Sequence, residues 1–189
     1  LDTLMAFARV APPASDGVFI IGGGGGSSVI YGDTCIREGL RVPTLSRQTM
    51  DELRRITPAA GSIAGNPLDH WLVFSDPAYL AQLVDLAEQD PAVAIILVDR
   101  LIARNAFHMQ DVPDPTPETI ARLKKRPGGK PIVFVVDSEG GDSELGAAGA
   151  AVRAAYGQAG YAVFPGIVRA ARALARLHRY YAKRAPMGA

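Results

Sequence analysis

Short apolar runs alternate with longer amphipathic segments along the chain, and this alternation predicts the fold class. The predicted strands are Val18–Ile21, Leu40–Val42, Val93–Val98, Ile132–Val136 and Tyr161–Phe164. Ile63 is a candidate for one further short extended segment. Several of the runs are apolar without alternation, which is typical of strands that helices cover on both faces. The pattern therefore predicts an α/β fold with a mostly parallel sheet.

Prolines and capping residues mark the helices. Asp76-Pro77 and Thr116-Pro117 each place a proline in the first turn of a predicted helix, and the second of these helices ends in basic residues at 124–126. The last predicted helix carries an apolar stripe and a basic stripe. The basic stripe consists of Arg169, Arg172, Arg176 and Arg179. We expect it to be a solvated face, and docking of an acidic partner domain is the alternative.

The first residues of the chain differ from the rest. Residues 1–9 have a helical pattern, and the loop that follows contains Pro12-Pro13 and Ser15-Asp16-Gly17. We expect residues 1–16 to be the end of a preceding domain with its linker, and residues 17–185 to be one domain. The chain begins at Leu1 without a signal-peptide pattern, which agrees with a piece of a longer protein.

Composition narrows the classes of function. The formal net charge of +1 gives no argument for a nucleic-acid or membrane-surface partner, and no apolar run has the length of a membrane span. Cys35 is the single cysteine and has no partner for an internal disulfide, which fits a reducing compartment. We therefore expect a cytoplasmic protein with no nucleic-acid partner, no membrane partner and no metal site.

The first predicted strand leads into five consecutive glycines, two serines and a predicted helix. Backbone N–H groups without side chains, together with the dipole of the helix, make such a turn suited to an anion. The predicted phosphate- or substrate-binding residues are Gly23, Gly24, Gly25, Gly26, Ser27 and Ser28. Ligands of α/β folds gather at the carboxyl ends of the strands, which supports this interpretation. A tight turn without any ligand is the alternative.

Two common nucleotide motifs do not fit the glycine run. A dinucleotide fingerprint needs a third glycine where Ser27 or Ser28 stands, and an acidic residue after the second strand, where Pro43-Thr44 follows. A P-loop needs Gly-Lys-Ser/Thr, and no lysine is near. A flavin domain or a receiver domain lacks support too, because the run differs from the Ser/Thr-rich flavin loop and no acidic cluster follows the first strand.

Longer stretches of the chain are more specific than the glycine run. The chain resembles the NDP-forming acyl-CoA synthetases, relatives of succinyl-CoA synthetase, in "GGGGGSSVIYGDTCIREGLRVPTLS" and "GNPLDHW". The resemblance continues through "DPAVAIILV", "KPIVFVVDSEGG" and "GYAVFPGIVRAARALARL". It implies a three-layer α/β/α, flavodoxin-like ligase domain. It also implies a larger enzyme that makes acyl-CoA from acid, CoA and ATP (with Mg) through a phosphohistidine.

The resemblance assigns this chain a pocket and no catalytic residue. The phosphohistidine, CoA-binding and ATP-grasp domains belong to the same chain or a partner chain, and no cofactor is bound by this domain alone. The glycine loop would face the phosphoryl or carboxylate group, and the loop from Asp99 to Phe107 would form the other wall. The implied pocket residues are Asn66, Asp69, Asp99 and Arg100. None of His70, His108 and His178 lies in a phosphohistidine-like loop.

Two departures from the family pattern keep a second hypothesis open. Gly23 stands where the family has asparagine, and Leu101-Ile102 stands where succinyl-CoA synthetase has a second glycine pair. A non-catalytic interaction or assembly module that kept the fold without the pocket would explain both. The identity of the acid, the choice of ADP or GDP and formation of a homo-oligomer stay open at this point.

Overall fold

The computed structural model describes residues 1–22, 24–100, 102, 114–123, 128–137 and 143–184. In this part of the chain, five parallel strands form one sheet in the order β2-β1-β3-β4-β5. The strands are β1 (Val18–Gly22), β2 (Leu68–Asp69), β3 (Ile95–Asp99), β4 (Ile132–Val135) and β5 (Ala162–Phe164). This strand order is that of flavodoxin-like folds, so the predicted fold class is confirmed.

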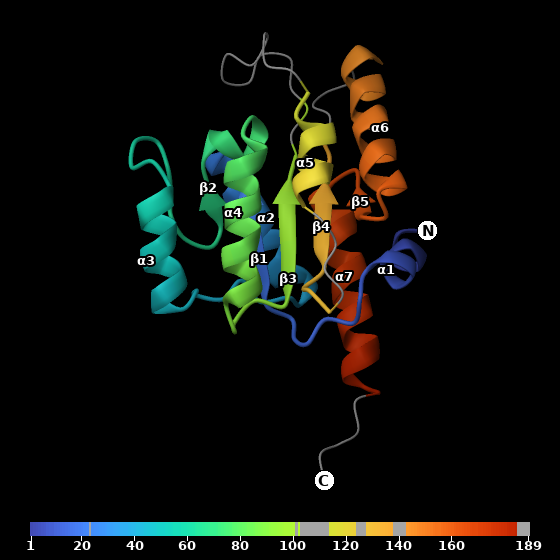
Figure 1. Cartoon of the computed structure of the whole chain (residues 1–189). Helices are drawn as coiled ribbons and strands as arrows, with labels where there is room; N and C mark the ends of the chain where they lie inside the picture. Colours follow the sequence, from blue (N-terminus) through green and yellow to red (C-terminus); the bar gives the residue numbers. More distant parts are fainter. Residues whose placement is uncertain (23, 101, 103–113, 124–127, 138–142, 185–189) are drawn as a thin grey trace.

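Helices cover both faces of the sheet, as the apolar strands require (Figure 1). The helices are α1 (Asp2–Arg9), α2 (Gly25–Glu38), α3 (Arg47–Ile56), α4 (Pro77–Gln89), α5 (Thr116–Arg122), α6 (Ser143–Gln158) and α7 (Ile167–Ala182), with a 3₁₀ turn η1 (Trp71–Phe74). Residues of α1, α2 and α7 share one apolar core with the strands, and residues of α3, α4 and α6 share the other. The result is three layers, α/β/α. None of the helices in these ranges has the length and apolar character needed to cross a membrane.

The predicted strand at Leu40–Val42 is wrong, and β2 takes the place beside β1. Arg41 makes only an isolated bridge to Gly17, just before β1. The Asn66 side chain then donates to Val18 O at 2.8 Å and accepts from Ile20 N at 3.0 Å. Leu68–Asp69 pairs with the last two residues of β1. Three separate segments therefore supply the hydrogen bonds for the side of β1 that faces away from β3. Each of them is too short for this pairing to be predicted from the sequence.

The other predicted strands are observed within two residues of their predicted bounds. β3 begins at Ile95 because Val93 lies in the turn that follows Asp90, with Val93 N donating to Asp90 O. The predicted cap of α4 is confirmed, since the Asp76 carboxylate accepts from Ala78 N and Tyr79 N. The basic end predicted for α5, at 124–126, lies outside the described residues.

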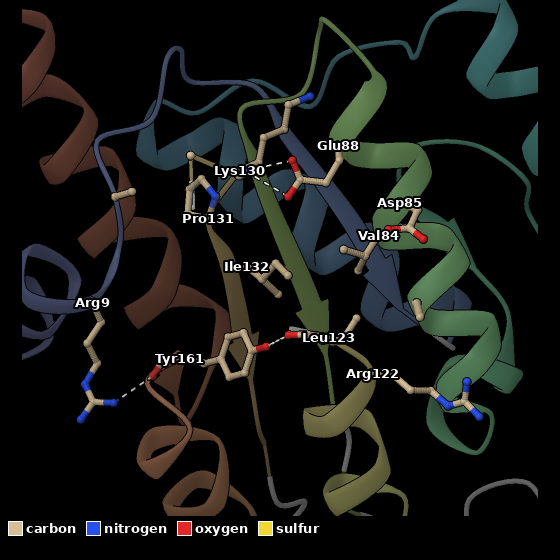
Figure 2. A pocket seen from close by; sticks show the side chains of 14 residues that line it. Arg9, Val84, Asp85, Glu88, Arg122, Leu123, Lys130, Pro131, Ile132 and Tyr161 are labelled. Atoms are coloured by element: carbon tan, nitrogen blue, oxygen red, sulfur yellow. Dashed lines mark hydrogen bonds between the residues drawn. The ribbon is translucent and has the colours of Figure 1, made fainter. Parts of the chain in front are cut away.

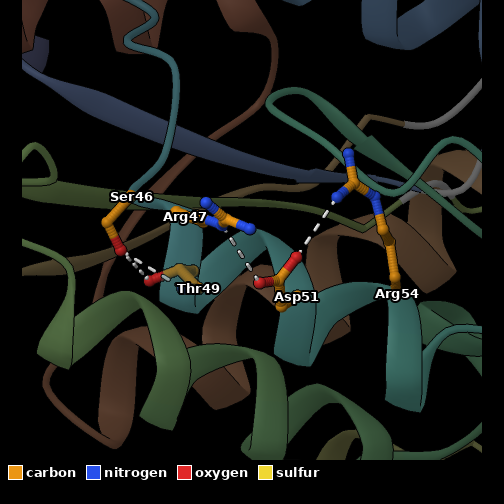
Figure 3. Close-up of polar contacts among 5 residues, drawn as sticks. All are labelled: Ser46, Arg47, Thr49, Asp51 and Arg54. Carbon is orange, nitrogen blue, oxygen red and sulfur yellow. Dashed lines mark hydrogen bonds and ion pairs between the residues drawn. The ribbon is translucent and has the colours of Figure 1, made fainter.

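Helix α3 has no counterpart among the predicted elements (Figure 3). Ser46 caps it by accepting from Thr49 N at 3.2 Å, and Asp51 pairs with Arg47 and Arg54 along its exposed side. The helix has a low mean hydropathy and buries few side chains, so its sequence reads as a polar loop.

The basic stripe of α7 pairs within the chain. Arg169 forms a bidentate ion pair with Asp2 of α1, and Arg172 pairs with Glu38 of α2 at 3.0 Å. Both arginines stay about half-exposed, so the stripe is a solvated face that also ties α1 and α2 to α7. For Arg169 and Arg172, the acidic groups are therefore residues of the chain itself.

Candidate functional site

The glycine run lies where this fold class holds its ligands. β1 stands next to β3 in the sheet, and the chain leaves β1 at Gly22 to begin α2 at Gly25. The gap between β1 and β3, at their carboxyl ends, is the topological switch point of a sheet with this strand order. Gly23 lies outside the described residues.

The first turn of α2 is open. Gly24 is the N-cap residue, and no side chain among the described residues caps the helix. The N–H groups of the first turn have no partner within a helix, so a bound anion can accept from them. Gly25 and Gly26 are exposed, and a Cβ placed on Gly26 would meet nothing within 4 Å. The backbone is therefore accessible at this point.

The two serines have different surroundings. Ser27 Oγ donates to Gly24 O at 2.8 Å and so closes the turn. Ser28 is only 6% exposed, and its Oγ has no hydrogen-bond partner in the part of the chain that the structure describes. A buried hydroxyl without a hydrogen-bond partner is uncommon in folded proteins.

Two of the implied pocket residues, Asp69 and Asp99, lie at this helix end. A Cβ placed on Gly25 would lie 3.3 Å from Asp69 Oδ2. Asp99 ends β3 next to Gly22, and its Oδ1 accepts from Tyr31 Oη at 2.9 Å. The structure therefore brings Asp69 and Asp99 together with Gly24–Ser28.

Both carboxyl groups are buried, and burial raises the pKa of each. Burial raises the pKa of Asp69, with His70 opposing the rise. Asp99 is 2% exposed, and burial raises its pKa to about 6, although the hydroxyls of Tyr31 and Ser27 oppose the rise. The pKa of Tyr31 is also raised, first by burial and then by the charge of Asp99. Perturbed carboxyl groups at a ligand-binding edge are typical of functional sites.

The other two implied pocket residues face elsewhere. The Asn66 amide binds the backbone of β1 at Val18 and Ile20, toward the start of that strand, and donates to Pro43 O. Arg100 is buried and lies 3.5 Å from Asp114. It also lies near Tyr156, whose ring belongs to the core on the opposite face from Tyr31. The remainder of the expected second wall, at 101 and 103–107, lies outside the described residues.

The histidines supply no exposed nucleophile in the described part of the chain. His70 is 1% exposed, its Nδ1 accepts from Leu72 N at 3.2 Å, and its ring stacks on Trp71. Burial lowers the pKa of His70, while Asp69 opposes the change. His178 lies on α7, in the helical layer that packs behind the sheet, and His108 lies outside the described residues.

Tyr31 and Asp137 are site residues that sequence reasoning did not identify. Tyr31 follows Ser28 by three residues, so both lie on the inward face of α2. Asp137 is exposed, comes two residues after β4, and acts on the charge of Asp99. The usable signal was that an aspartate directly follows two predicted strands that are neighbours in the sheet, Asp99 after Val93–Val98 and Asp137 after Ile132–Val136.

A cavity of about 200 Å³, here called the Lys130 cavity, lies near the amino ends of the strands (Figure 2). Lys130 and Tyr161 line it just before β4 and β5 begin. Lys130 N donates to Glu88, Lys130 Nζ donates to Ala87 O, and Tyr161 Oη donates to Leu123 O. These polar groups are satisfied by the chain itself, so the cavity resembles a structural feature. No group of three or more metal-ligating side chains occurs among the described residues.

The strand order and the helices on both faces of the sheet define a flavodoxin-like α/β domain. The family model of the Ligase-CoA domain matches residues 18–152, so the chain belongs to this family. The predicted resemblance is thereby confirmed. No curated protein is significantly similar in sequence.

Solved structures support the same fold. PH0766 from Pyrococcus horikoshii OT3 matches with a TM-score of 0.76 and 20% identity, over 99% of this chain and 41% of that one. Apo dinucleotide-forming acetyl-coenzyme A synthetase 1 from Ca. Korarchaeum cryptofilum matches with a TM-score of 0.75 and 19% identity, over 97% and 37%. The same synthetase in complex with phosphate and ADP matches with a TM-score of 0.72 and 18% identity, over 99% and 39%. This chain thus spans about two fifths of their length.

Proposed function

We propose that this chain is the ligase domain of a larger NDP-forming acyl-CoA synthetase. The carboxyl ends of its strands, with the start of α2, would form one wall of the pocket where the carboxylic acid meets a phosphohistidine. Membership of the Ligase-CoA family supports the class of reaction. One solved relative by fold is an acetyl-coenzyme A synthetase in complex with phosphate and ADP, which agrees with phosphoryl chemistry.

The uncapped first turn of α2 carries the proposal. Its free backbone N–H groups suit the oxygens of a phosphoryl or carboxylate group, and exposed Gly26 lets such a group approach. Ser28 Oγ adds a buried hydroxyl without a partner in the described residues. The dipole of a 14-residue helix points its positive end at the same place.

In this proposal the nucleophile, CoA and ATP with Mg belong to other domains. His70 is buried and its Nδ1 already accepts a hydrogen bond, so it is poorly suited to carry a phosphoryl group. The solved relatives are more than twice as long as this chain, which leaves room for phosphohistidine, CoA-binding and ATP-grasp domains. The chain alone would then have no turnover, and an enzyme using ATP and CoA would work in the cytoplasm.

The outer face of α2 is suited to receive the phosphohistidine domain. Val29, Ile30 and Ile36 are 58–64% exposed on this helix, which begins at the glycine loop. Apolar side chains gathered on one helix are typical of an interaction surface. A domain seated there would bring its histidine to the open end of α2.

The experiment fills the open turn with a side chain. In the full-length protein, Gly26→Val adds a side chain where the structure leaves space, so folding is preserved while an oxyanion is blocked. We expect acyl-CoA synthesis from acid, CoA and ATP to fall by about a hundredfold, because small displacements of a reacting group have costs of this size. Acid-labile phosphohistidine should still form, since it is made elsewhere.

Gly146→Val is the matched control. Gly146 is also a helical glycine at which an added Cβ would meet nothing within 4 Å, but it lies on α6. This variant should keep full activity. Unchanged activity of Gly26→Val in an active synthetase would contradict the pocket and favour the second candidate, an interaction or assembly module without a pocket.

A further inference from the structure

Two carboxyl groups of the chain already lie at the helix end that the proposed function gives to an anion. Asp69 Oδ2 would lie 3.3 Å from a Cβ at Gly25, and Asp99 Oδ2 would lie 3.7 Å from one at Gly22. These distances place both carboxyl groups beside the backbone of the glycine turn, and like charges brought close together oppose each other, most strongly where water is excluded. An incoming oxyanion therefore meets negative charge as well as the open N–H groups.

Ser28 indicates independently that a ligand belongs here. The residue is 6% exposed, and its Oγ would lie 3.6 Å from a Cβ placed on Gly22, beside Asp99. This Oγ has no hydrogen-bond partner among the described residues. A hydroxyl in this position can donate to an oxyanion at the α2 N-terminus, which would remove the cost of leaving it unpaired.

Among the residues that the structure describes, the charged and titratable groups around Asp99 provide little compensation for its charge. Tyr31 and Cys35 on α2 are neutral, since burial raises the pKa of both, and Asp137 after β4 adds negative charge. Asp69 is a second acid at the end of β2, and the pKa of its neighbour His70 is lowered. Arg100 attracts Asp99 but is paired with Asp114. Protonation of Asp69 or Asp99 is the simplest way to lower the repulsion between these carboxylates and a bound oxyanion.

We infer that an anion bound at the α2 N-terminus is taken up together with one proton, and that Asp99 holds this proton. The inference rests on the proposed function, because it concerns the same site. Asp99 is suited to the role by its burial and by its contact with Tyr31 Oη, which accepts or donates as the protonation state requires. Near neutral pH the proton is within reach, since the pKa of Asp99 is raised to about 6 by burial.

The coupling gives anion binding a defined pH dependence. Below pH 6 Asp99 is protonated before the anion arrives, so affinity is at its highest and constant. Above pH 6 each bound dianion must bring a proton to Asp99, and affinity falls about tenfold per pH unit. At pH 8, two units higher, the affinity should be about a hundredfold below its maximum.

Sulfate is the probe, because it stays a dianion throughout this range. Its dissociation constant is measured by isothermal titration calorimetry with the full chain, between pH 5 and pH 8. The wild type should show the fall above pH 6. Asp99→Asn keeps an acceptor for Tyr31 but cannot ionise, so its affinity should stay high and flat. Asp51→Asn removes the same charge from exposed α3 and should keep the wild-type profile.

A second variant tests the assignment without removing the carboxyl group. Tyr31→Phe deletes the hydroxyl that favours ionised Asp99, so the fall in sulfate affinity should begin at a higher pH than in the wild type. An unshifted profile would overturn the role of Asp99.

The outcomes separate this inference from the proposed function. Sulfate binding that does not vary with pH in the wild type would overturn the coupling and leave the anion site intact. A wild-type slope that survives in Asp99→Asn would overturn the assignment to Asp99. Absence of sulfate binding at every pH in every variant would contradict the anion site of the proposed function itself.

Discussion

Asp90 and Asp99 are both buried carboxyl groups, but Asp90 lies before strand β3 and Asp99 lies at its end, and their surroundings differ. Asp90 is 0% exposed, ends α4 and precedes β3. It accepts from Ser46 N at 2.7 Å and from Ala92 N at 2.9 Å. Asp99 is 2% exposed and follows β3, with Tyr31 Oη as its close donor at 2.9 Å.

The two groups respond oppositely to burial. Burial favours a higher pKa for Asp90, but hydrogen bonds from Thr49, Ser46 and Ala92 outweigh it and the pKa is lowered. For Asp99 burial outweighs the hydroxyl donors, and the pKa is raised to about 6. Backbone N–H donors stabilise a buried anion, whereas a carboxyl group with few donors is left ready to bind a proton. A carboxylate held by several backbone N–H donors is typical of a residue that stabilises the fold. A buried carboxyl group with few donors and a raised pKa is typical of a functional site.

The largest expected effect is that of Asp90→Ala. The substitution leaves the partly buried N–H groups of Ser46 and Ala92 without their acceptor, at a cost of about 1–3 kcal/mol each. We expect the free energy of unfolding to fall by about 3 kcal/mol or more, measured by urea denaturation at pH 7. Asp90→Asn keeps one acceptor and should lose less.

The stability contributed by Asp90 should also depend on pH. Its pKa is lower in the folded chain than in the unfolded one, so the contribution is present above the unfolded value and is lost as the pH falls through the folded value. The difference in stability between wild type and Asp90→Ala should therefore shrink in acid. A difference that stays constant down to low pH would contradict an ionised, hydrogen-bonded Asp90.

A smaller effect of opposite sign is expected for Asp99→Asn. The folded pKa of Asp99, about 6, lies above the unfolded value, so wild-type stability falls as the pH rises from about 4 through 6. The shift corresponds to about 3 kcal/mol at most. Asp99→Asn avoids this loss and should be the more stable protein at pH 8 by up to that amount.

Urea denaturation from pH 4 to pH 8 measures the difference. It should be small at pH 4, grow through pH 6 and level off above pH 7. A variant less stable than the wild type at pH 8 would show that ionised Asp99 is well satisfied, and the contrast with Asp90 would disappear.

Sequence patterns predicted the parts of the fold that are locally encoded. β1, β3, β4 and β5 are continuous apolar runs, so they are visible without tertiary information. β2 was missed because only Leu68 and Asp69 form it, while the Asn66 amide takes the place of a strand beside Val18 and Ile20. The hydrogen bonding along this side of β1 depends on segments that are distant in the sequence, so no local pattern predicts it.

The candidate site was predictable to a similar degree. Gly24–Ser28 was predicted because it follows an apolar run, whose end lies with those of the other parallel strands on one side of the sheet. Asp69 and Asp99 were predicted from the family resemblance alone. Tyr31 was not identified, because its contact with Asp99 joins residues 68 positions apart. Asn66 and Arg100 came from family resemblance, which matches positions but does not say on which face a side chain lies.

The central claim is that the oxyanion binds at the carboxyl ends of the strands, at the start of α2, and not in the cavity near their amino ends. An NMR titration of the ¹⁵N-labelled chain with inorganic phosphate at pH 6 tests it most directly. We predict that the amide resonances of Gly25, Gly26 and Ser27 shift with phosphate. Those of Gly128, Gly129 and Lys130, which line the Lys130 cavity, should not shift. Shifts confined to Gly128–Lys130, with none at the start of α2, would contradict the account.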